Sequence, residues 1–304
     1  MFFRNLTLFR FPEGIDQRFK KLDEQLAEHE LRPCGPLELQ TRGWVSPYGR
    51  GEELFSIEHG GAALMALGGE DKLLPTAVIN QHIAEKVEEL EKQRGRPVGA
   101  RERRKLKDDA LTELLPRALA RPSRLAGYVD IANGWVVVDT SSRKAAEGFV
   151  SALRNALGSF PATSLEPEES PRALMTEWMI EGKLPAGFAL GDECELKDPA
   201  DNGAIVRCRR QDLAADEMRE HLSSGKQVTQ LALTFEERMR FVLDETLTVR
   251  KFKLLDIAVE QLEQGDRDSA KAELDARFVL LSGEVARLLA AIETTFGVYR
   301  PQSL

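Results

Sequence analysis

Residues 127–139 read G-Y-V-D-I-A-N-G-W-V-V-V-D and contain the clearest structural signal in the chain. Two β-rich runs flank Asn133-Gly134, a dipeptide that favours a type I′ hairpin turn because both central residues of that turn need a positive φ. Thr140 or Ser141 can cap the helix that follows, whose apolar residues recur at helical spacing over residues 145–157. The stretch therefore predicts an antiparallel hairpin followed by a helix.

On the N-terminal side, alternating residues 6–9 predict a first strand, and apolar residues at helical spacing predict a helix over residues 16–30. Amphipathic patterns predict two antiparallel helices over residues 76–92 and 101–120, joined by a glycine- and proline-containing connection. Before this pair, glycine-separated runs predict three short strands: residues 43–45, 54–58 and 62–67.

On the C-terminal side, a polar loop over residues 161–171 is the best candidate for an internal boundary. Asp212 can cap a helix that runs toward Ser223. The last pattern, residues 274–296, repeats apolar residues in alternating steps of four and three, which suits either a core helix or a self-association surface. Between the polar loop and this last pattern, residues 173–181 predict one helix. Five strands are predicted over residues 188–190, 204–210, 228–233, 238–243 and 246–252.

The charge of the chain is unevenly distributed. The 304 residues carry a net charge of −8, but residues 92–107, K-Q-R-G-R-P-V-G-A-R-E-R-R-K-L-K, hold eight cations against Glu102 alone. This run has a balance of +7, so the remaining residues sum to −15. Such a run either binds a polyanion or is a solvated loop without a ligand. The acidic remainder does not exclude DNA, because charges beyond a Debye length of about 8–10 Å act weakly.

Several classes of protein are disfavoured by the composition. No stretch approaches the roughly 18 uncharged apolar residues of a membrane span. Arg4 and Arg10 interrupt the apolar N-terminus, which lacks the order of a signal peptide. Cys34, Cys194 and Cys208 are odd in number and far apart in the sequence, so we expect buried thiols in a reducing cytoplasm.

Patterns for catalysis are largely missing. Gly182-Lys183 and Gly225-Lys226 lack the Ser/Thr and the glycine spacing of a phosphate-binding loop, and the histidines are scattered. Asp130, Asp139 and Glu181 leave one enzymatic alternative, a metal-dependent nuclease, although turn and cap chemistry also accounts for both aspartates. A third alternative is a protein-interaction scaffold whose basic run contacts an acidic partner. No cofactor or metal is predicted.

Short motifs along the whole chain occur in the same order as in a known protein family. They are F-F-R-N-L-T-L-F-R at residues 2–10, P-C-G at 33–35, G-W-V-S-P at 43–47, K-L-L-P at 72–75, L-L-P-R-A at 114–118, L-G-S-F-P at 157–161, T-E-W at 176–178, R-R-Q-D-L at 209–213 and S-G-E-V-A-R-L-L at 282–289. No single motif is decisive, but the ordered set resembles the recombination-associated protein RdgC family of bacteria.

The resemblance implies a non-enzymatic protein that binds duplex DNA without sequence preference and also takes single-stranded DNA. It implies an α+β fold with a β-rich central body and projecting helical elements, in which a crescent-shaped subunit closes into a ring-like homodimer around DNA. It further implies a cytoplasmic, nucleoid-associated regulator that restrains the RecA recombinase by occupying DNA.

The expected organisation has four parts. Residues 1–75 form the N-terminal strand–helix–sheet part of the central body, and residues 76–125 form a projecting basic helical pair. Residues 126–165 form the hairpin with its helix, and residues 166–304 form a C-terminal α+β part with the long terminal helix.

The resemblance and the charge pattern together give the candidate DNA-binding residues. The family has a segment that begins with basic residues and Gln, and it uses the segment after L-L-P-R-A near DNA. Leu119-Ala120 stands where relatives can carry an aromatic residue, which puts a stacking or wedging role in doubt. The candidates are Lys72, Arg94, Arg96, Arg101, Arg103, Arg104, Lys105, Lys107, Arg117, Arg121, Arg124, Arg207, Arg209, Arg210 and Gln211.

Overall fold

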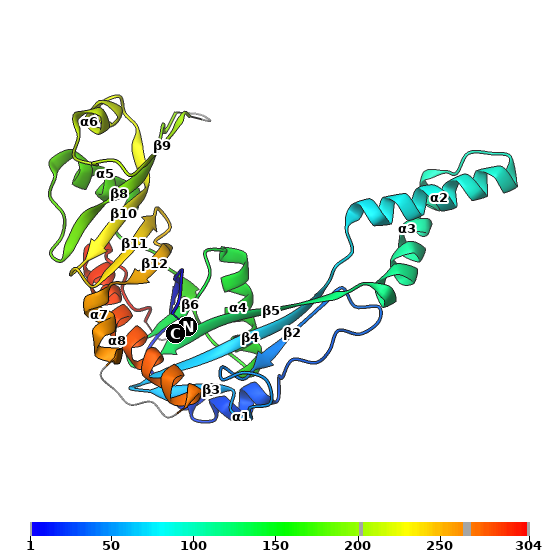
Figure 1. The fold of residues 1–304 in the computed structure, drawn as a ribbon, viewed down its shortest axis with the longest axis horizontal. Coiled ribbons are helices and arrows are strands. Elements are labelled where there is room, and N and C mark those ends of the chain that lie inside the picture. The colour runs from blue at the N-terminus through cyan, green and yellow to red at the C-terminus, as the bar shows by residue number, and fades with distance from the viewer. Residues whose placement is uncertain (1, 201–202, 264–268, 303–304) are drawn as a thin grey trace. The chain divides into compact units, whose positions relative to one another are not determined.

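The protein, described from a computed structural model over residues 2–200, 203–263 and 269–302, folds as two compact units. Unit 1 comprises Met1–Glu28, Ser46–Ala66 and Leu125–Leu304. Unit 2 comprises His29–Val45 and Leu67–Arg124. Helices and strands occur in both units, which confirms the α+β class (Figure 1).

The first sheet contains β1 (Thr7–Arg10), β2 (Gln40–Val45), β3 (Ser56–His59), β4 (Ala62–Lys72), β5 (Ala120–Asp130), β6 (Trp135–Val138) and β7 (Thr163–Ser164). The strand order is β2-β4-β5-β6-β1-β7, and β3 pairs with β4. β1 and β5 flank β6, and both pair with it in antiparallel register. Strands β4 and β5 contribute residues to both units, while the predicted first strand corresponds to β1 in unit 1.

The predicted hairpin is confirmed as β5 and β6, with Asp130 opposite Trp135. The predicted type I′ turn is wrong. A four-residue loop joins the strands, and within it only Gly134 has a positive φ, of 74°. The Asp130 carboxylate instead accepts hydrogen bonds from the backbone nitrogen of Asn133 at 3.0 Å and from its side chain at 2.8 Å. An aspartate that satisfies turn amides makes the second positive φ unnecessary.

The helix after the hairpin, α4 (Arg143–Ala156), begins one residue later than a Ser141 cap and two residues later than a Thr140 cap would allow. Ser142 is the cap, and its hydroxyl accepts from the backbone nitrogen of Ala145 at 3.4 Å. The Thr140 hydroxyl accepts from the backbone nitrogen of Ser142 and so supports the turn before the helix. Phe149 of α4 packs against the hairpin so closely that a Cβ on Gly127 would lie 2.7 Å from its ring.

The predicted helix over residues 16–30 is broken and shorter. A 3-10 turn, η1 (Asp16–Phe19), precedes the helix α1 (Leu22–Ala27). Lys21 between them has non-helical dihedral angles, with φ −121° and ψ 30°. The break lets Phe19 pack edge-on against Phe160, with ring centroids 5.8 Å apart, while Leu22 remains buried.

A second sheet lies entirely in unit 1 and contains β8 (Phe188–Lys197), β9 (Ile205–Arg209), β10 (Gln227–Phe235), β11 (Met239–Asp244) and β12 (Val249–Leu254). The strand order is β12-β11-β10-β8-β9, and each neighbouring pair is antiparallel. The predicted meander corresponds to β10, β11 and β12. One face of the sheet supplies buried residues such as Leu231, Leu243 and Val249 to the core of unit 1.

Four helices complete unit 1: α5 (Pro171–Glu181), α6 (Asp216–Ser223), α7 (Asp256–Glu263) and α8 (Ala270–Phe296). The apolar seam of α8 is buried in the core, from Phe278 to Phe296, so the core-helix interpretation is confirmed for this seam. The cap predicted for Asp212 is wrong, because α6 begins at Asp216 and the Asp212 carboxylate accepts from the backbone nitrogen of Ala214. The sequence pattern did not predict α7.

Unit 2 carries the predicted helical pair, as α2 (Thr76–Arg94) and α3 (Ala100–Leu114). Gly95 ends α2 with a φ of 63°, a left-handed conformation that favours glycine. The second helix does not reach residue 120 as predicted. Pro116 follows α3 within a 3-10 turn, η2 (Leu115–Arg117), and the chain is already a strand from Ala120.

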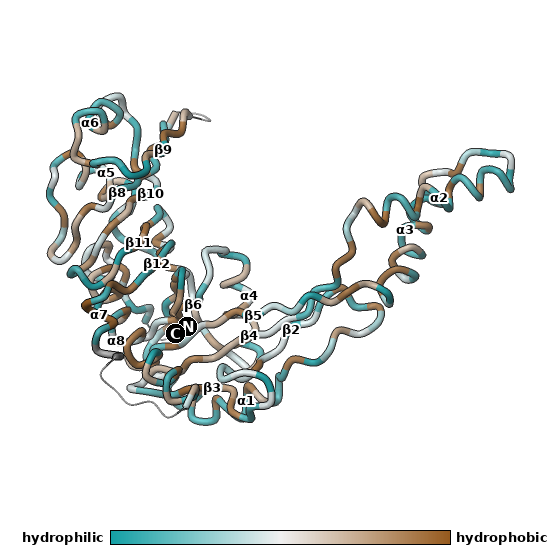
Figure 2. Tube along the Cα trace, in the orientation of Figure 1, coloured by the Kyte–Doolittle hydropathy of each residue, from teal (hydrophilic) through white to brown (hydrophobic). Residues whose placement is uncertain are grey.

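Hydropathy separates the core from the solvent-facing connection. Figure 2 shows hydrophobic residues along α8 and the sheet strands, and hydrophilic residues at the turn between α2 and α3. Within residues 2–200, 203–263 and 269–302, no helix is both long enough and apolar enough to span a membrane.

Candidate nucleic-acid interface

Two carboxylates organise the connection between α2 and α3. Glu91 accepts from the backbone nitrogen of Val98 at 2.9 Å, and Glu102 makes the larger set of contacts. Glu102 accepts hydrogen bonds from Arg94 at 2.7 Å and from both terminal nitrogens of Arg96 at 2.9 and 3.1 Å. It also accepts from the backbone nitrogen of Gly99 at 3.1 Å, so its side chain satisfies the N-cap amide at the start of α3. These contacts, with the Arg96 hydrogen bond first and the Gly99 bond second, lower the pKa of Glu102 to about 2. The only acid of the basic run therefore holds the connection together.

The remaining cations of α3 have no such partner. We call Arg101, Arg103, Arg104, Lys105 and Lys107 the α3 basic cluster. All five are exposed, and within the described ranges no carboxylate lies within 4.0 Å of their charged nitrogens. Because the N-terminal end of a helix already carries partial positive charge, five cations in the first two turns repel one another and the helix dipole. An anionic ligand would relieve that repulsion.

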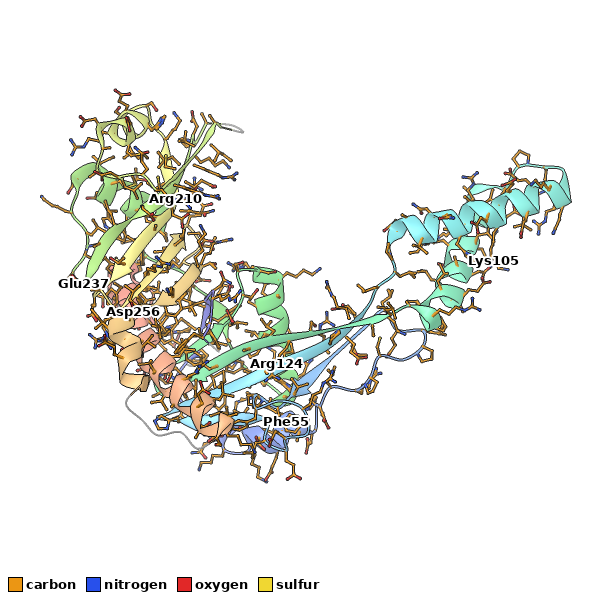
Figure 3. The ribbon with its side chains drawn as sticks, viewed as in Figure 1. Phe55, Lys105, Arg124, Arg210, Glu237 and Asp256 are labelled. Atoms are coloured by element: carbon orange, nitrogen blue, oxygen red, sulfur yellow. The ribbon has the colours of Figure 1, made fainter. Side chains whose placement is uncertain are left out.

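The predicted residues beside η2 have different roles. Lys72 donates to the carbonyl of Leu115 at 3.2 Å, so it helps hold the turn after α3. Arg117 and Arg121 are exposed, and neither has a carboxylate within 4.0 Å among the residues that the structure describes. Arg124 is exposed on β5, yet desolvation lowers its pKa (Figure 3). Leu119 has 76% of its surface exposed.

Strand β9 at one edge of the second sheet presents the predicted residues of unit 1. Its Arg207 and Arg209 lie opposite Glu195 and Glu193 of β8. Arg207 donates to Glu195 at 2.6 Å, but Glu193 instead accepts from Lys251 of β12 at 2.6 and 2.8 Å. In the described part of the chain, Arg209 is therefore left without a carboxylate at ion-pair distance.

The two residues after Arg209 leave the strand. Arg210 has a φ of 54°, a left-handed conformation that turns the chain toward α6 (Figure 3). Gln211 donates from its side chain to Glu217 at 2.8 Å and from its backbone nitrogen to the carbonyl of Asp192 at 3.1 Å. The side chain of Gln211 is thus engaged within unit 1.

Four cations that sequence reasoning missed share the non-core face of this sheet. Arg240 lies opposite Lys253, and Arg250 lies opposite Val242. A cavity of about 330 Å³ opens over the face, and Arg207, Arg209, Arg250 and Lys251 are among its lining residues. We call this surface the outer-sheet cationic face, formed by Arg207, Arg209, Arg240, Arg250, Lys251 and Lys253. Three carboxylates, from Glu193, Glu195 and Asp244, lie among these six cations and pair with only three of them.

The alternation of charged and apolar residues could have revealed this face. Residues 249–254 read V-R-K-F-K-L and residues 239–241 read M-R-F, so cations alternate with residues that are buried in the core. Such alternation is typical of a half-buried strand.

Two of the three residues of the nuclease alternative, Asp130 and Asp139, have structural partners. The Asp139 carboxylate accepts from the backbone nitrogens of Arg4 at 2.8 Å and Asn5 at 3.0 Å, and Asp130 stabilises the hairpin loop. Glu181 is the last residue of α5. Across the described ranges, no group of three or more His, Cys, Asp or Glu side chains is arranged to hold a metal ion.

The predicted residues thus fall into two groups, one in each unit. A family model described as "Putative exonuclease, RdgC" matches residues 1–299. The chain belongs to the RdgC family. A protein of Stenotrophomonas maltophilia (strain R551-3) named "Recombination-associated protein RdgC" is 50% identical over 297 residues, which cover 97% of this chain and 98% of the relative.

A relative of the same name from Xanthomonas axonopodis pv. citri (strain 306) is 48% identical over 295 residues, or 97% of each chain. These names associate the RdgC relatives with recombination and mention no enzymatic activity. The family membership predicted from the ordered motifs is confirmed.

Proposed function

We propose that the chain binds DNA without sequence preference through phosphate contacts and so limits access of the RecA recombinase to DNA. The observation that carries the proposal is the α3 basic cluster, whose five exposed cations have no carboxylate at ion-pair distance among the described residues. Arginine forks can engage two phosphate oxygens and lysines act as point charges. Neither contact reads a base, so sequence preference is not expected.

The outer-sheet cationic face supports the same proposal. Only Arg207, Arg250 and Lys251 of its six cations have carboxylate partners, and Arg209, Arg240 and Lys253 remain available for phosphate within the described chain. The proposal includes a ring-shaped homodimer that encloses duplex or single-stranded DNA and acts on the nucleoid in the cytoplasm. The family resemblance supports this part, and binding by occupancy needs no catalytic centre.

The salt dependence of duplex binding tests the proposal. We expect the logarithm of the binding constant to fall linearly with the logarithm of salt concentration, for duplexes of unrelated sequence alike. Replacing Arg101 and Arg104 by Ala should lower the slope by about 1 for each lost contact. Lys144→Ala, an exposed cation on α4, is the matched control and should leave the slope unchanged. A flat salt dependence or a strong preference for one sequence would contradict the proposal.

Two further measurements address assembly and competition. Light scattering should give twice the mass of the 34.0 kDa chain if the protein is a dimer. Added protein should then slow assembly of RecA filaments on DNA in proportion to the DNA that it occupies. Tight binding to RecA in the absence of DNA would instead favour the protein-scaffold alternative.

The description of the family model keeps a nuclease as the second candidate function. Incubation of linear and circular DNA with the protein and Mg²⁺ distinguishes the two. We expect intact DNA. Shortening of linear DNA that is lost in an Asp139→Asn variant would establish the nuclease and reject simple occupancy.

A further inference from the structure

Two cysteines lie directly opposite each other in the second sheet. Cys194 of β8 and Cys208 of β9 are register partners, and both are free thiols. Cys194 is buried in the core of unit 1, while Cys208 is half-buried and packs against the same core. Burial raises the pKa of the Cys194 thiol to about 12, and the neighbouring Cys208 thiol contributes to the rise. The two sulfur atoms therefore share one environment.

The hydrogen-bond pattern fixes the type of this pair. Asp198 donates from its backbone nitrogen to the carbonyl of Ala204 at 3.2 Å, so these two residues form a hydrogen-bonded pair. Pair types alternate along an antiparallel ladder, and Cys194 with Cys208 stands four steps further along. The cysteines are therefore also a hydrogen-bonded pair, for which the Cα atoms are about 5.5 Å apart.

That spacing permits a disulfide but does not favour a relaxed one. Disulfides span Cα separations of about 4.4–6.8 Å and need Cβ atoms about 3.5–4.5 Å apart. Directly opposed Cβ atoms in such a pair are nearer to about 5.5 Å. Closing the bond therefore requires the two strands to twist so that the Cβ atoms approach by about 1 Å. A bond that stores such strain is more readily reduced.

Strand β9 is able to make this movement. It stands at the end of the strand order, and among the described residues it pairs only with β8, so no second described strand holds it. Cys208 stands between Arg207 and Arg209, whose side chains belong to the outer-sheet cationic face. Because neighbouring side chains of a strand point to opposite faces, a twist that draws the cysteines together turns these arginines relative to β8.

We propose that Cys194 and Cys208 are a reversible dithiol–disulfide pair that responds to small organic disulfides. The half-buried Cys208 thiolate attacks one sulfur of the small disulfide, whose S–S bond breaks and releases one thiol. Cys194, which is protonated near neutral pH because burial raises its pKa, then loses its proton to solvent. Its sulfur attacks the Cys208 sulfur of the mixed disulfide and releases the second thiol. The protein loses two electrons and two protons, and the small disulfide gains them as two thiols.

Under the proposed DNA-binding function, oxidation also weakens DNA binding. The disulfide would move Arg207 and Arg209 away from the positions that they hold in the dithiol form. We expect duplex affinity to fall by roughly three- to tenfold, which corresponds to the net loss of about one ordinary hydrogen bond. This second step rests on the proposed function, whereas the disulfide itself does not.

The test uses the full-length chain with Cys34→Ser, which removes the third thiol, and oxidised glutathione as the probe. We expect intact mass spectrometry to show loss of two hydrogen atoms, and peptide mapping to find the segment around Cys194 linked to that around Cys208. Dithiothreitol should restore both thiols. Cys208→Ala in the same background is the control and should form no intramolecular bond. Peptide mapping of the unsubstituted chain makes the result independent of the Cys34 substitution.

Duplex binding is then measured for the oxidised and reduced forms of the Cys34→Ser protein. Absence of the linked peptides, or a glutathione adduct that never closes, would overturn the dithiol–disulfide pair whatever the DNA result. A disulfide with affinities equal within about twofold would overturn its coupling to DNA. A disulfide in a protein that binds no DNA in either form would overturn the proposed function and the coupling, and would leave the redox pair established.

Discussion

At the scale of single residues, Glu102 determines how many cations of the basic run, residues 92–107, have a carboxylate partner. Its carboxylate neutralises Arg94 and Arg96 and caps α3 through Gly99. The sequence showed that this acid was alone among eight cations. It did not show which cations it would engage, because the two arginines reach it only after the turn at Gly95 brings them beside the start of α3.

Glu102→Gln is expected to strengthen DNA binding at low salt. The change releases two arginines, so the log–log salt slope should increase by up to about 2 in magnitude. Fluorescence anisotropy with a labelled duplex measures both quantities. Glu88→Gln is the matched control, because it releases only Lys92 and should add at most about 1 to the slope. Weaker binding by the Glu102 variant would show that the cap, and not the charge, matters to the interface.

The pKa of Glu102 gives a second expectation at this scale. Arg96 is the largest cause of the shift and Arg94 the smallest, so Arg96→Ala should raise this pKa from about 2 toward its ordinary value more than Arg94→Ala does. A carboxyl whose pKa is lowered on folding stabilises the folded connection above the unfolded pKa of about 4.3. That contribution is lost as pH falls through about 2. Carbon-detected NMR titration of the Glu102 carboxyl distinguishes the variants, and equal midpoints would contradict this order.

At the scale of elements, two ion pairs link α8 to the same turn between β10 and β11. Arg238 pairs with Glu284 through two hydrogen bonds of 2.6 and 2.8 Å, and both side chains are largely buried. Arg287 pairs with Glu236 at the surface. The pairs differ mainly in burial, which makes them suited to direct comparison.

Arg238→Ala should lower the free energy of unfolding by about 3–5 kcal/mol, because it leaves the buried Glu284 carboxylate unpaired. Arg287→Ala, the control, should cost about 0–1 kcal/mol. Urea denaturation measures both. Replacing Arg238 and Glu284 together by Met should recover most of the loss. Similar effects for the two single variants would mean that Glu284 reaches water in the native state.

Helices and strands were predictable from the sequence where burial of one face makes apolar residues recur at a regular spacing. The residues at which these helices and strands end were not predictable. The patterns in α4 and α8 correspond to a buried face, the pattern in α2 corresponds to a half-buried one, and each helix was found. The end of α3 depended on how Pro116 is accommodated, and the start of α6 depended on where Asp212 finds its donor. Such local competition between hydrogen-bonding partners produces no periodic pattern in the sequence.

The candidate DNA-binding surfaces were likewise predictable only in part. The α3 basic cluster was visible as a charge run, but the outer-sheet cationic face was only partly predicted. Pairing of Lys251 with Glu193 joins residues on strands β12 and β8, which are not neighbours in the sheet. That contact leaves Arg209 without a carboxylate partner among the described residues. The spacing of residues within β8 or β12 does not predict such a contact.

At the scale of the whole molecule, the two cationic surfaces belong to different units. If one duplex contacts both, replacing Arg101 and Arg104 by Ala and replacing Arg209 and Lys253 by Ala should reduce the salt slope independently. The fourfold variant should then show the sum of the two reductions within error. Anisotropy at several salt concentrations measures the slopes. A pair of variants in which only one lowers the slope would assign DNA binding to a single unit.

The residues near the two ends of the described chain are joined in unit 1. Arg300 donates to the carbonyl of Phe11 at 3.1 Å and to that of Ala132 at 3.1 Å, and Leu6 and Val249 exchange backbone hydrogen bonds of 2.7 and 3.0 Å. During translation, the first strand therefore leaves the ribosome long before its late partners have been made. Unit 1 can complete its folding only after residue 300 has been synthesised, and until then that strand depends on the hairpin or on a chaperone to avoid pairing elsewhere.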